Sequence, residues 1–115
     1  MKVFVIGAVR SATREWRQAL ELHVVELEGK GHDVHLPHRD TKQDAAGLNI
    51  CQQNVAAIAA ADEVHLFYSP HSKGTHFDMG AAFALGKRLR VIANVPYGPG
   101  KSYPRMADEW ERATA

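Results

Sequence analysis

The stretch from Ser72 to Gly80 combines groups that could bind an anion with a carboxylate that could do chemistry. It follows an apolar run and leads into a helix-like segment. The Ser72 hydroxyl and the backbone around Gly74 suit an anion, because N–H groups at a helix start carry partial positive charge. Asp78 has two interpretations: it either completes a capping box with Thr75 as N-cap, or presents an ionised carboxylate, stabilised by the helix dipole, to a crevice.

A second candidate anion site follows the first apolar run, where the sequence reads Gly7-Ala8-Val9-Arg10. A glycine at the end of a strand lets the backbone approach a ligand closely, and the following helix start presents its N–H groups. The guanidinium of Arg10 offers planar donors that match phosphate. The alternative is an ordinary strand-to-helix turn with a solvated arginine.

Histidines supply further candidates. His38 follows the second apolar run and could stack on a base or form a hydrogen bond to it. His71 and His76 flank the stretch around the carboxylate, which leaves a metal site open as an alternative. We expect no metal, because no His-x-x-x-His pair lies on a predicted helix and Cys51 is the single cysteine.

Alternating strands and helices must position these groups. The pattern predicts strands at 2–6, 33–36, 63–68 and 89–93, a polar loop at 39–47, and helices at 13–28, 48–60, 76–85 and 103–112. This alternation indicates an α/β fold, a Rossmann-like or flavodoxin-like three-layer sandwich with a parallel sheet of four to five strands. With strand order 2-1-3-4, loops 7–12, 37–40 and 69–78 meet at the topological switch point, where such sheets bind ligands.

The helix faces give an expected core. The first helix is predicted to bury Trp16, Leu20, Val24 and Leu27, and the second to bury Leu48, Cys51, Val55, Ile58 and Ala59. Near the C-terminus lie Tyr97, Tyr103, Met106 and Trp110, which indicate either an interface or a helix that docks on its own sheet.

Composition sets the class of protein. The chain has 115 residues, 45% of them hydrophobic, and a net charge of +1, which predicts one globular domain over residues 1–115. Without a basic excess or a long apolar run, we expect no nucleic-acid or membrane partner. The first residues read as a strand and not as a signal peptide. The single Cys51 favours a reducing, cytoplasmic location.

Two related patterns are excluded. Gly100-Lys101-Ser102 resembles the end of a phosphate-binding P-loop, but Val95 stands where its first glycine belongs, and the loop follows the last strand. A response-regulator receiver needs an acidic pair after the first strand, where this chain has Gly7-Ala8.

Taken together, three blocks resemble the nucleoside 2-deoxyribosyltransferase superfamily, most closely its branch of 2′-deoxynucleoside 5′-monophosphate N-glycosidases. The blocks are Val5–Arg10, Ile50–Asn54 with Ala61–Val64, and Ser72–Gly80 continuing to Lys87. The third block is the most specific, since the family pattern there is a Gly, a short spacer, an acid, one residue and a Gly.

The resemblance implies a reaction at C1′ of a deoxyribose. Asp78 matches the family's nucleophilic glutamate, and Arg10 and Ser72 match positions that hold a 5′-phosphate. His38 matches a base-side position. The substrate implied is a nucleotide or nucleoside, with no cofactor, and the protein is implied to be a homodimer or higher homo-oligomer.

This sequence departs from the family at two positions. The nucleophile is Asp, one methylene shorter than Glu, and Asn54 replaces a helix-borne carboxylate. An amide can form hydrogen bonds but cannot usefully transfer a proton. His38, Asp40 or the substrate phosphate could replace the missing acid. These departures leave a non-catalytic nucleotide-binding or nucleotide-sensing domain as the alternative function.

Overall fold

The computed structural model describes residues 1–10, 12–43 and 46–115. Its elements, in chain order, are β1 (Lys2–Ile6), α1 (Arg14–Gly29), β2 (Asp33–His35), α2 (Pro37–Asp40), α3 (Gly47–Ala60), β3 (Glu63–Phe67), α4 (Lys73–Ala84), β4 (Arg88–Ala93) and α5 (Tyr103–Ala113).

Within the described ranges the sheet has four strands in the order β2-β1-β3-β4, and every pair is parallel. Phe4 of the central strand β1 is in register with His35 on one side and Val64 on the other. The chain therefore reverses its direction of winding between β1 and β3. The predicted α/β Rossmann-like fold and strand order are confirmed.

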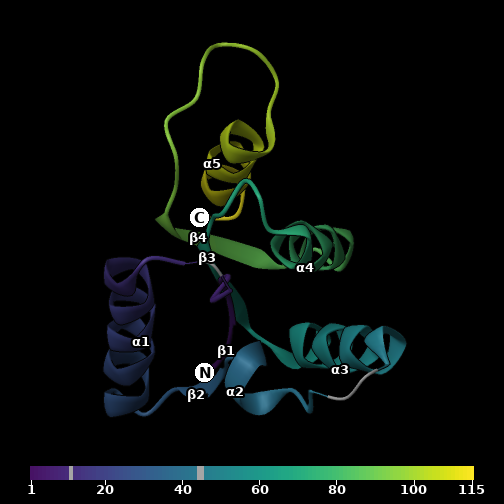
Figure 1. The fold of residues 1–115 in the computed structure, drawn as a ribbon. Helices are drawn as coiled ribbons and strands as arrows, with labels where there is room; N and C mark the ends of the chain where they lie inside the picture. The colour runs from purple at the N-terminus through teal and green to yellow at the C-terminus, as the bar shows by residue number, and fades with distance from the viewer. Residues whose placement is uncertain (11, 44–45) are drawn as a thin grey trace.

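Alternate residues of β1 point into two separate cores. Val3 and Val5 pack with residues of α1, whereas Phe4 and Ile6 pack with residues of α3, α4 and α5. Helix α1 accordingly covers one face of the sheet, and α3 and α4 lie side by side on the other (Figure 1). The period-two alternation of a strand thus produces the three-layer arrangement.

The predicted buried face is right for α1 and partly wrong for α3. Leu20, Val24 and Leu27 are buried as expected. On α3, by contrast, Leu48 is 72% exposed, and the buried residues are Asn54 and Ile58. The apolar residues of α3, many of them alanines, are distributed around most of the helix, so the apolar pattern does not single out one face.

Two local predictions are wrong. Residues 37–40 form the helical turn α2, with Pro37 in the first turn, where proline is favoured, so the polar loop begins later than expected. Helix α4 begins at Lys73 instead of His76, because Ser72 and not Thr75 is the N-cap. The Ser72 hydroxyl oxygen accepts a hydrogen bond from the Thr75 N–H at 3.1 Å.

Helix α5 docks on the edge strand β4. The side chains of Thr114 and Glu111 accept hydrogen bonds from the backbone N–H groups of Leu89 and Val91. Trp110 is 7% exposed, and its indole N–H donates to the Lys87 carbonyl at 2.9 Å. The C-terminal segment therefore packs on its own sheet and occupies edge N–H groups that could otherwise pair with another strand. Tyr103 remains 61% exposed.

No helix in the described parts of the chain has the length and apolarity needed to cross a membrane.

Candidate active site

A cavity of about 780 Å³ opens at the carboxyl ends of β1 and β3, at the switch point of the sheet. Its lining includes every site residue predicted from the sequence: Gly7, Arg10, His38, Asn54, Ser72, Gly74 and Asp78. The structure therefore brings together residues from two loops and three helices. Trp16, Tyr68, His71 and Lys73 also line this cavity.

Asp78 is the buried carboxylate of the cavity, with 7% of its surface exposed. Burial raises its pKa from 3.8 to about 6, although a hydrogen bond from Asn54 acts in the opposite direction. Because α4 begins at Lys73, Asp78 lies beyond the first helical turn, and the capping box with Thr75 is wrong. The predicted stabilisation of the carboxylate by the helix start is outweighed by its removal from water.

Asn54 lies on α3 and is 8% exposed, as expected for an inward-facing polar residue. Its Nδ2 donates to Asp78 Oδ1 at 3.5 Å, and its Oδ1 accepts from the Thr41 hydroxyl at 2.6 Å. Thr41 in turn lies 2.8 Å from Nε2 of His35. Thr41 and His35 are functional candidates that the sequence did not reveal. The available signal was Asn54 itself, because a buried amide needs several polar partners. The sequence did not show which loop supplies these partners.

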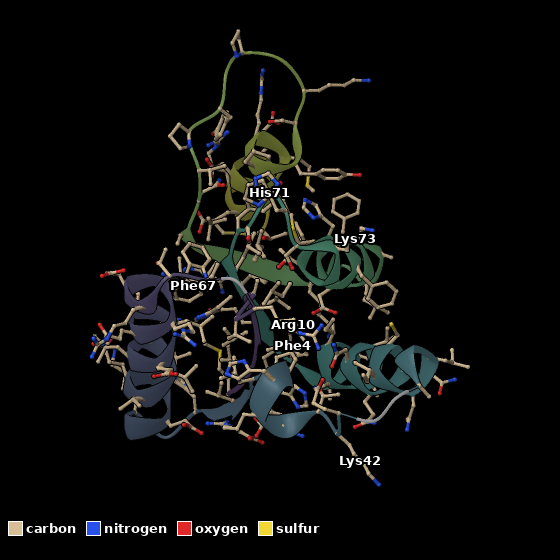
Figure 2. All side chains as sticks on the ribbon, viewed as in Figure 1. Phe4, Arg10, Lys42, Phe67, His71 and Lys73 are labelled. Carbon is tan, nitrogen blue, oxygen red and sulfur yellow. The ribbon has the colours of Figure 1, made fainter. Side chains whose placement is uncertain are left out.

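The phosphate-binding groups predicted from the sequence lie around the N-terminus of α4. Arg10 comes from the loop after β1, Ser72 is the N-cap of α4, and Gly74 lies in its first turn. Two further side chains line the same cavity without having been predicted for this role: His71 from the β3–α4 loop and Lys73 from the first residue of α4 (Figure 2). The Ser72 oxygen accepts the Thr75 N–H, so its hydroxyl proton can be donated elsewhere. A helix N-terminus with adjacent cationic side chains provides N–H donors and positive charge for an anion.

Gly7 has a packing role in addition to the one predicted. A Cβ atom at this position would overlap the side chain of Leu20, which is fully buried in the α1 core. Glycine therefore allows the loop that begins the cavity wall to pack directly against α1. Gly74 lies in the first turn of α4, where an added Cβ would meet only the Ser72 hydroxyl, at 4.0 Å.

Tyr68 and His76 form a second polar pair beside the cavity. His76 Nδ1 lies 2.7 Å from the Ser72 carbonyl oxygen and donates to it, so a neutral His76 accepts the Tyr68 hydroxyl at Nε2, at 2.9 Å. Both ring nitrogens of His76 therefore form hydrogen bonds within the protein. Across the described ranges, no cluster of three or more His, Cys, Asp or Glu side chains could hold a metal ion.

No family model and no curated protein matches the sequence. Solved structures do match. The CMP N-glycosidase BcmB from Clostridium botulinum is 25% identical, with a TM-score of 0.63 over 79% of this chain and 70% of that one. The chain belongs to the nucleoside 2-deoxyribosyltransferase superfamily.

Two further structures agree with this superfamily in fold. The 2-deoxyribosyltransferase from Bacillus psychrosaccharolyticus is 15% identical, with a TM-score of 0.73 over 99% of this chain and 90% of that one. The 2-desoxiribosyltransferase from Leishmania mexicana is 20% identical, with a TM-score of 0.65 over 90% of this chain and 79% of that one. The family suggested by the sequence blocks is confirmed.

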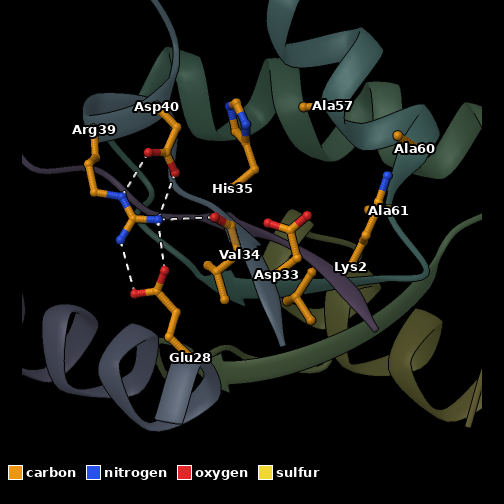
Figure 3. A pocket seen from close by; sticks show the side chains of 11 residues that line it. Lys2, Glu28, Asp33, Val34, His35, Arg39, Asp40, Ala57, Ala60 and Ala61 are labelled. Carbon is orange, nitrogen blue, oxygen red and sulfur yellow. Dashed lines mark hydrogen bonds and ion pairs between the residues drawn. The ribbon is translucent and has the colours of Figure 1, made fainter. Parts of the chain in front are cut away.

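A second cavity, of about 460 Å³, is lined by a network of ion pairs around Arg39 (Figure 3). Arg39 binds Glu28 at 3.1 Å and Asp40 at 2.8 Å, and it also donates to the Val34 carbonyl. The hydrogen bond from Arg39 lowers the pKa of Asp40. Asp40 lines this cavity and not the one that holds Asp78.

Proposed function

We propose that the chain, as one domain over residues 1–115, cleaves or transfers the N-glycosidic bond of a 2′-deoxynucleoside 5′-monophosphate or nucleoside. Membership of the superfamily places it among glycosyl hydrolases and transferases. The observation that carries the proposal is the buried carboxylate of Asp78 in the same cavity as Arg10 and the N-terminus of α4.

Asp78 is the nucleophile in this proposal. One carboxylate oxygen attacks C1′ through an oxocarbenium-like transition state, while the C1′–N bond breaks and its electron pair leaves with the base. The glycosyl ester is then released by water in a hydrolase, or by a second base in a transferase. A pKa of about 6 leaves most of the carboxyl ionised at pH 7 and more basic than an exposed aspartate.

Arg10, Ser72 and the backbone at Gly74 bind the 5′-phosphate in this proposal, and Lys73 adds positive charge to the same end of the cavity. The similarity to the Clostridium botulinum protein, a CMP N-glycosidase, also favours a nucleotide over a nucleoside. His38 then contacts the base. Because CMP is a ribonucleotide, both sugars belong in the test.

The departing base needs a proton that the Asn54 amide cannot supply. Of the groups suggested as replacements, His38 lines the cavity, whereas Asp40 faces the other cavity and is bound by Arg39. Burial lowers the pKa of His38, so its ring is neutral at pH 7 and can donate from one nitrogen. His38 or the substrate phosphate is therefore the proton donor to test.

The deciding experiment incubates the protein with ribo- and deoxynucleoside 5′-monophosphates and the matching nucleosides, and detects free base by chromatography and mass spectrometry. We expect one or a few nucleotides to release base, and the Asp78→Ala protein to release none. A second run with a competing free base separates transfer from hydrolysis. Absence of base release from every substrate, with folded protein at high concentration, would refute the proposal.

A nucleotide-sensing domain is the second candidate, and Asn54 is the observation that favours it. An amide at the position of the family's second acid, together with a nucleophile shorter by one methylene, suits a site that binds without turnover. This candidate predicts that a nucleotide raises the melting temperature without product formation, and that Asp78→Asn leaves the binding affinity unchanged.

We also propose that the protein is a homodimer or higher homo-oligomer and acts in the cytoplasm. Apolar side chains on α4 and α5 support association, because Phe77, Phe83 and Tyr103 are 46%, 60% and 61% exposed. Light scattering at micromolar concentration tests the oligomer, and a monomer would refute it. The location is inferred from the single Cys51 alone.

A further inference from the structure

A line of hydrogen-bonded side chains runs from β2 to the Asp78 carboxylate. It begins at His35, whose Nε2 lies 2.8 Å from Thr41 Oγ1. Thr41 donates to Asn54 Oδ1 at 2.6 Å, and Asn54 Nδ2 donates to Asp78 Oδ1 at 3.5 Å. Thr41, Asn54 and Asp78 are 3%, 8% and 7% exposed, so bulk water does not compete for these bonds.

Proton counting fixes the direction of this line. The Thr41 hydroxyl has a single proton, and it is donated to Asn54. The Thr41 oxygen can then only accept from His35, so the His35 proton resides on Nε2. If the direction were reversed, Asn54 would turn its oxygen toward Asp78, and two acceptors would face each other without a proton between them.

We propose that Thr41 and His35 are positioning residues for Asp78 and act through Asn54. They hold the Asn54 amide with its N–H toward the carboxylate, which favours the ionised form of Asp78. The catalytic part of this role rests on the proposed function, whereas the effect on the titration of Asp78 does not.

The surroundings of the line keep its members in place. The His35 ring is stacked on Phe4, with centroids 5.3 Å apart and planes 8° from parallel. Burial lowers the pKa of His35, so it donates as a neutral ring at pH 7. Gln43 donates to the Thr41 carbonyl oxygen at 3.0 Å and also to the carbonyl of Pro37. The loop that carries Thr41 is therefore anchored at its backbone as well as at its side chain.

Other charged or titratable side chains line the cavity around Asp78 and must be kept constant in a test. Arg10, His38, His71 and Lys73 line the same cavity, from the loop after β1, from α2, from the β3–α4 loop and from α4. Substitutions at Thr41 and His35 leave all four in place, so a change in the Asp78 titration would report the hydrogen-bonded line.

The test compares Thr41→Val, which keeps the side-chain shape and removes the hydroxyl, with Thr41→Ser, which retains it. The carboxyl carbon of Asp78 is titrated by NMR in protein labelled with 13C-aspartate, and its signal is assigned by its loss in Asp78→Asn. We expect Thr41→Val to raise the pKa of Asp78 by about one unit, because an Asn54 amide that is no longer held in place loses its hydrogen bond to the charged carboxylate. Thr41→Ser should restore the wild-type titration.

His35 gives a second, independent pair of variants. His35→Phe keeps the stack on Phe4 and removes the donor, whereas His35→Gln retains an N–H that can reach Thr41. We expect the first to raise the pKa of Asp78 and the second to leave it near the wild-type value. If Thr41→Val fails to fold, as judged by circular dichroism, this pair still tests the proposal.

Kinetics with the substrate found in the base-release assay supply the catalytic readout. We expect Thr41→Val to lower kcat about fivefold at pH 6 with little change in KM, because the ionised fraction of the nucleophile falls from about one half to about one tenth. An unchanged Asp78 titration in folded Thr41→Val and His35→Phe would overturn the proposal. A shifted titration in a protein that releases no base from any nucleotide would support the positioning role and refute the proposed function.

Discussion

The side-chain amide of Asn54 lies 3.5 Å from the carboxylate of Asp78, and this contact joins α3 to α4 in the lining of the cavity. A neutral amide lowers the pKa of Asp78 less than burial raises it, which is why the result is about 6. An arginine in the same place would have held the pKa well below its ordinary value. The contact therefore gives a carboxylate that is ionised at pH 7 but poorly solvated.

The first prediction concerns the pH dependence of base release. Only the ionised Asp78 can attack C1′, so kcat/KM should fall about tenfold per pH unit below pH 6, with an acidic limb at about 6. The measurement is a kcat/KM profile between pH 4.5 and 8 with a substrate that carries no titrating group in that range. A profile that stays flat down to pH 4.5 would rule out a buried Asp78 nucleophile.

The second prediction is a gain in stability when Asp78 loses its charge. The pKa of Asp78 is raised in the folded state, so the folded protein binds the proton more tightly, and stability is lost as the pH rises through about 6. Asp78→Asn keeps the volume and removes the charge. We expect its free energy of unfolding at pH 7.5 to exceed that of the wild type by up to about 3 kcal/mol, the equivalent of roughly two pKa units.

Urea unfolding at pH 7.5 and pH 3.5 checks this stability difference. At pH 3.5 the wild-type carboxyl is protonated in the folded state and mostly protonated in the unfolded state, so the advantage of Asp78→Asn should nearly disappear. Glu21→Gln, on an exposed face of α1, is the matched control and should change stability little at either pH. Equal stability of the Asp78→Asn and wild-type proteins at pH 7.5 would contradict the assigned burial cost.

Much of this arrangement could be predicted from the sequence, because the carboxyl ends of parallel strands must meet. Gly7 directly follows β1, whereas Ser72 lies in the loop after β3 and Asp78 in the helix that this loop enters. Because β1 and β3 are neighbours in the sheet, the strand order alone brings these residues together. Such proximity requires no knowledge of side-chain packing.

The contribution of Thr41 and His35 could not be predicted in the same way. Thr41 lies in a polar stretch that the sequence predicts as a loop, and its burial depends on the helical turn α2, which was not predicted there. The start of α4 was missed because Ser72 and Thr75 are equally good N-caps by residue type, and only the three-dimensional path of the loop selects between them.

The third prediction tests the phosphate end of the cavity. Arg10→Met keeps much of the length and loses the charge, so KM for a nucleoside 5′-monophosphate should rise about 10- to 100-fold, as expected for one or two charge-assisted hydrogen bonds. The matching nucleoside, which lacks the phosphate, should be affected little. Steady-state kinetics on both substrates make the comparison.

Arg17→Met is the control for this substitution, because Arg17 is an exposed arginine on α1 outside the cavity lining. It should leave both KM values near those of the wild type. An equal rise in KM for nucleotide and nucleoside in Arg10→Met would show that Arg10 does not contact the phosphate.

The fourth prediction concerns the docking of α5 on the sheet. Trp110 packs in the core with Leu89 and Met79 and donates to the Lys87 carbonyl, so Trp110→Ala should lower the free energy of unfolding by about 3–5 kcal/mol. Trp110→Phe keeps the ring but leaves that carbonyl without its indole donor, and should cost about 1–2 kcal/mol. Urea unfolding measures both. Leu22→Ala, at a side chain 58% exposed, should change stability by less than about 0.5 kcal/mol. A Trp110→Ala protein as stable as this control would show that α5 does not dock through Trp110.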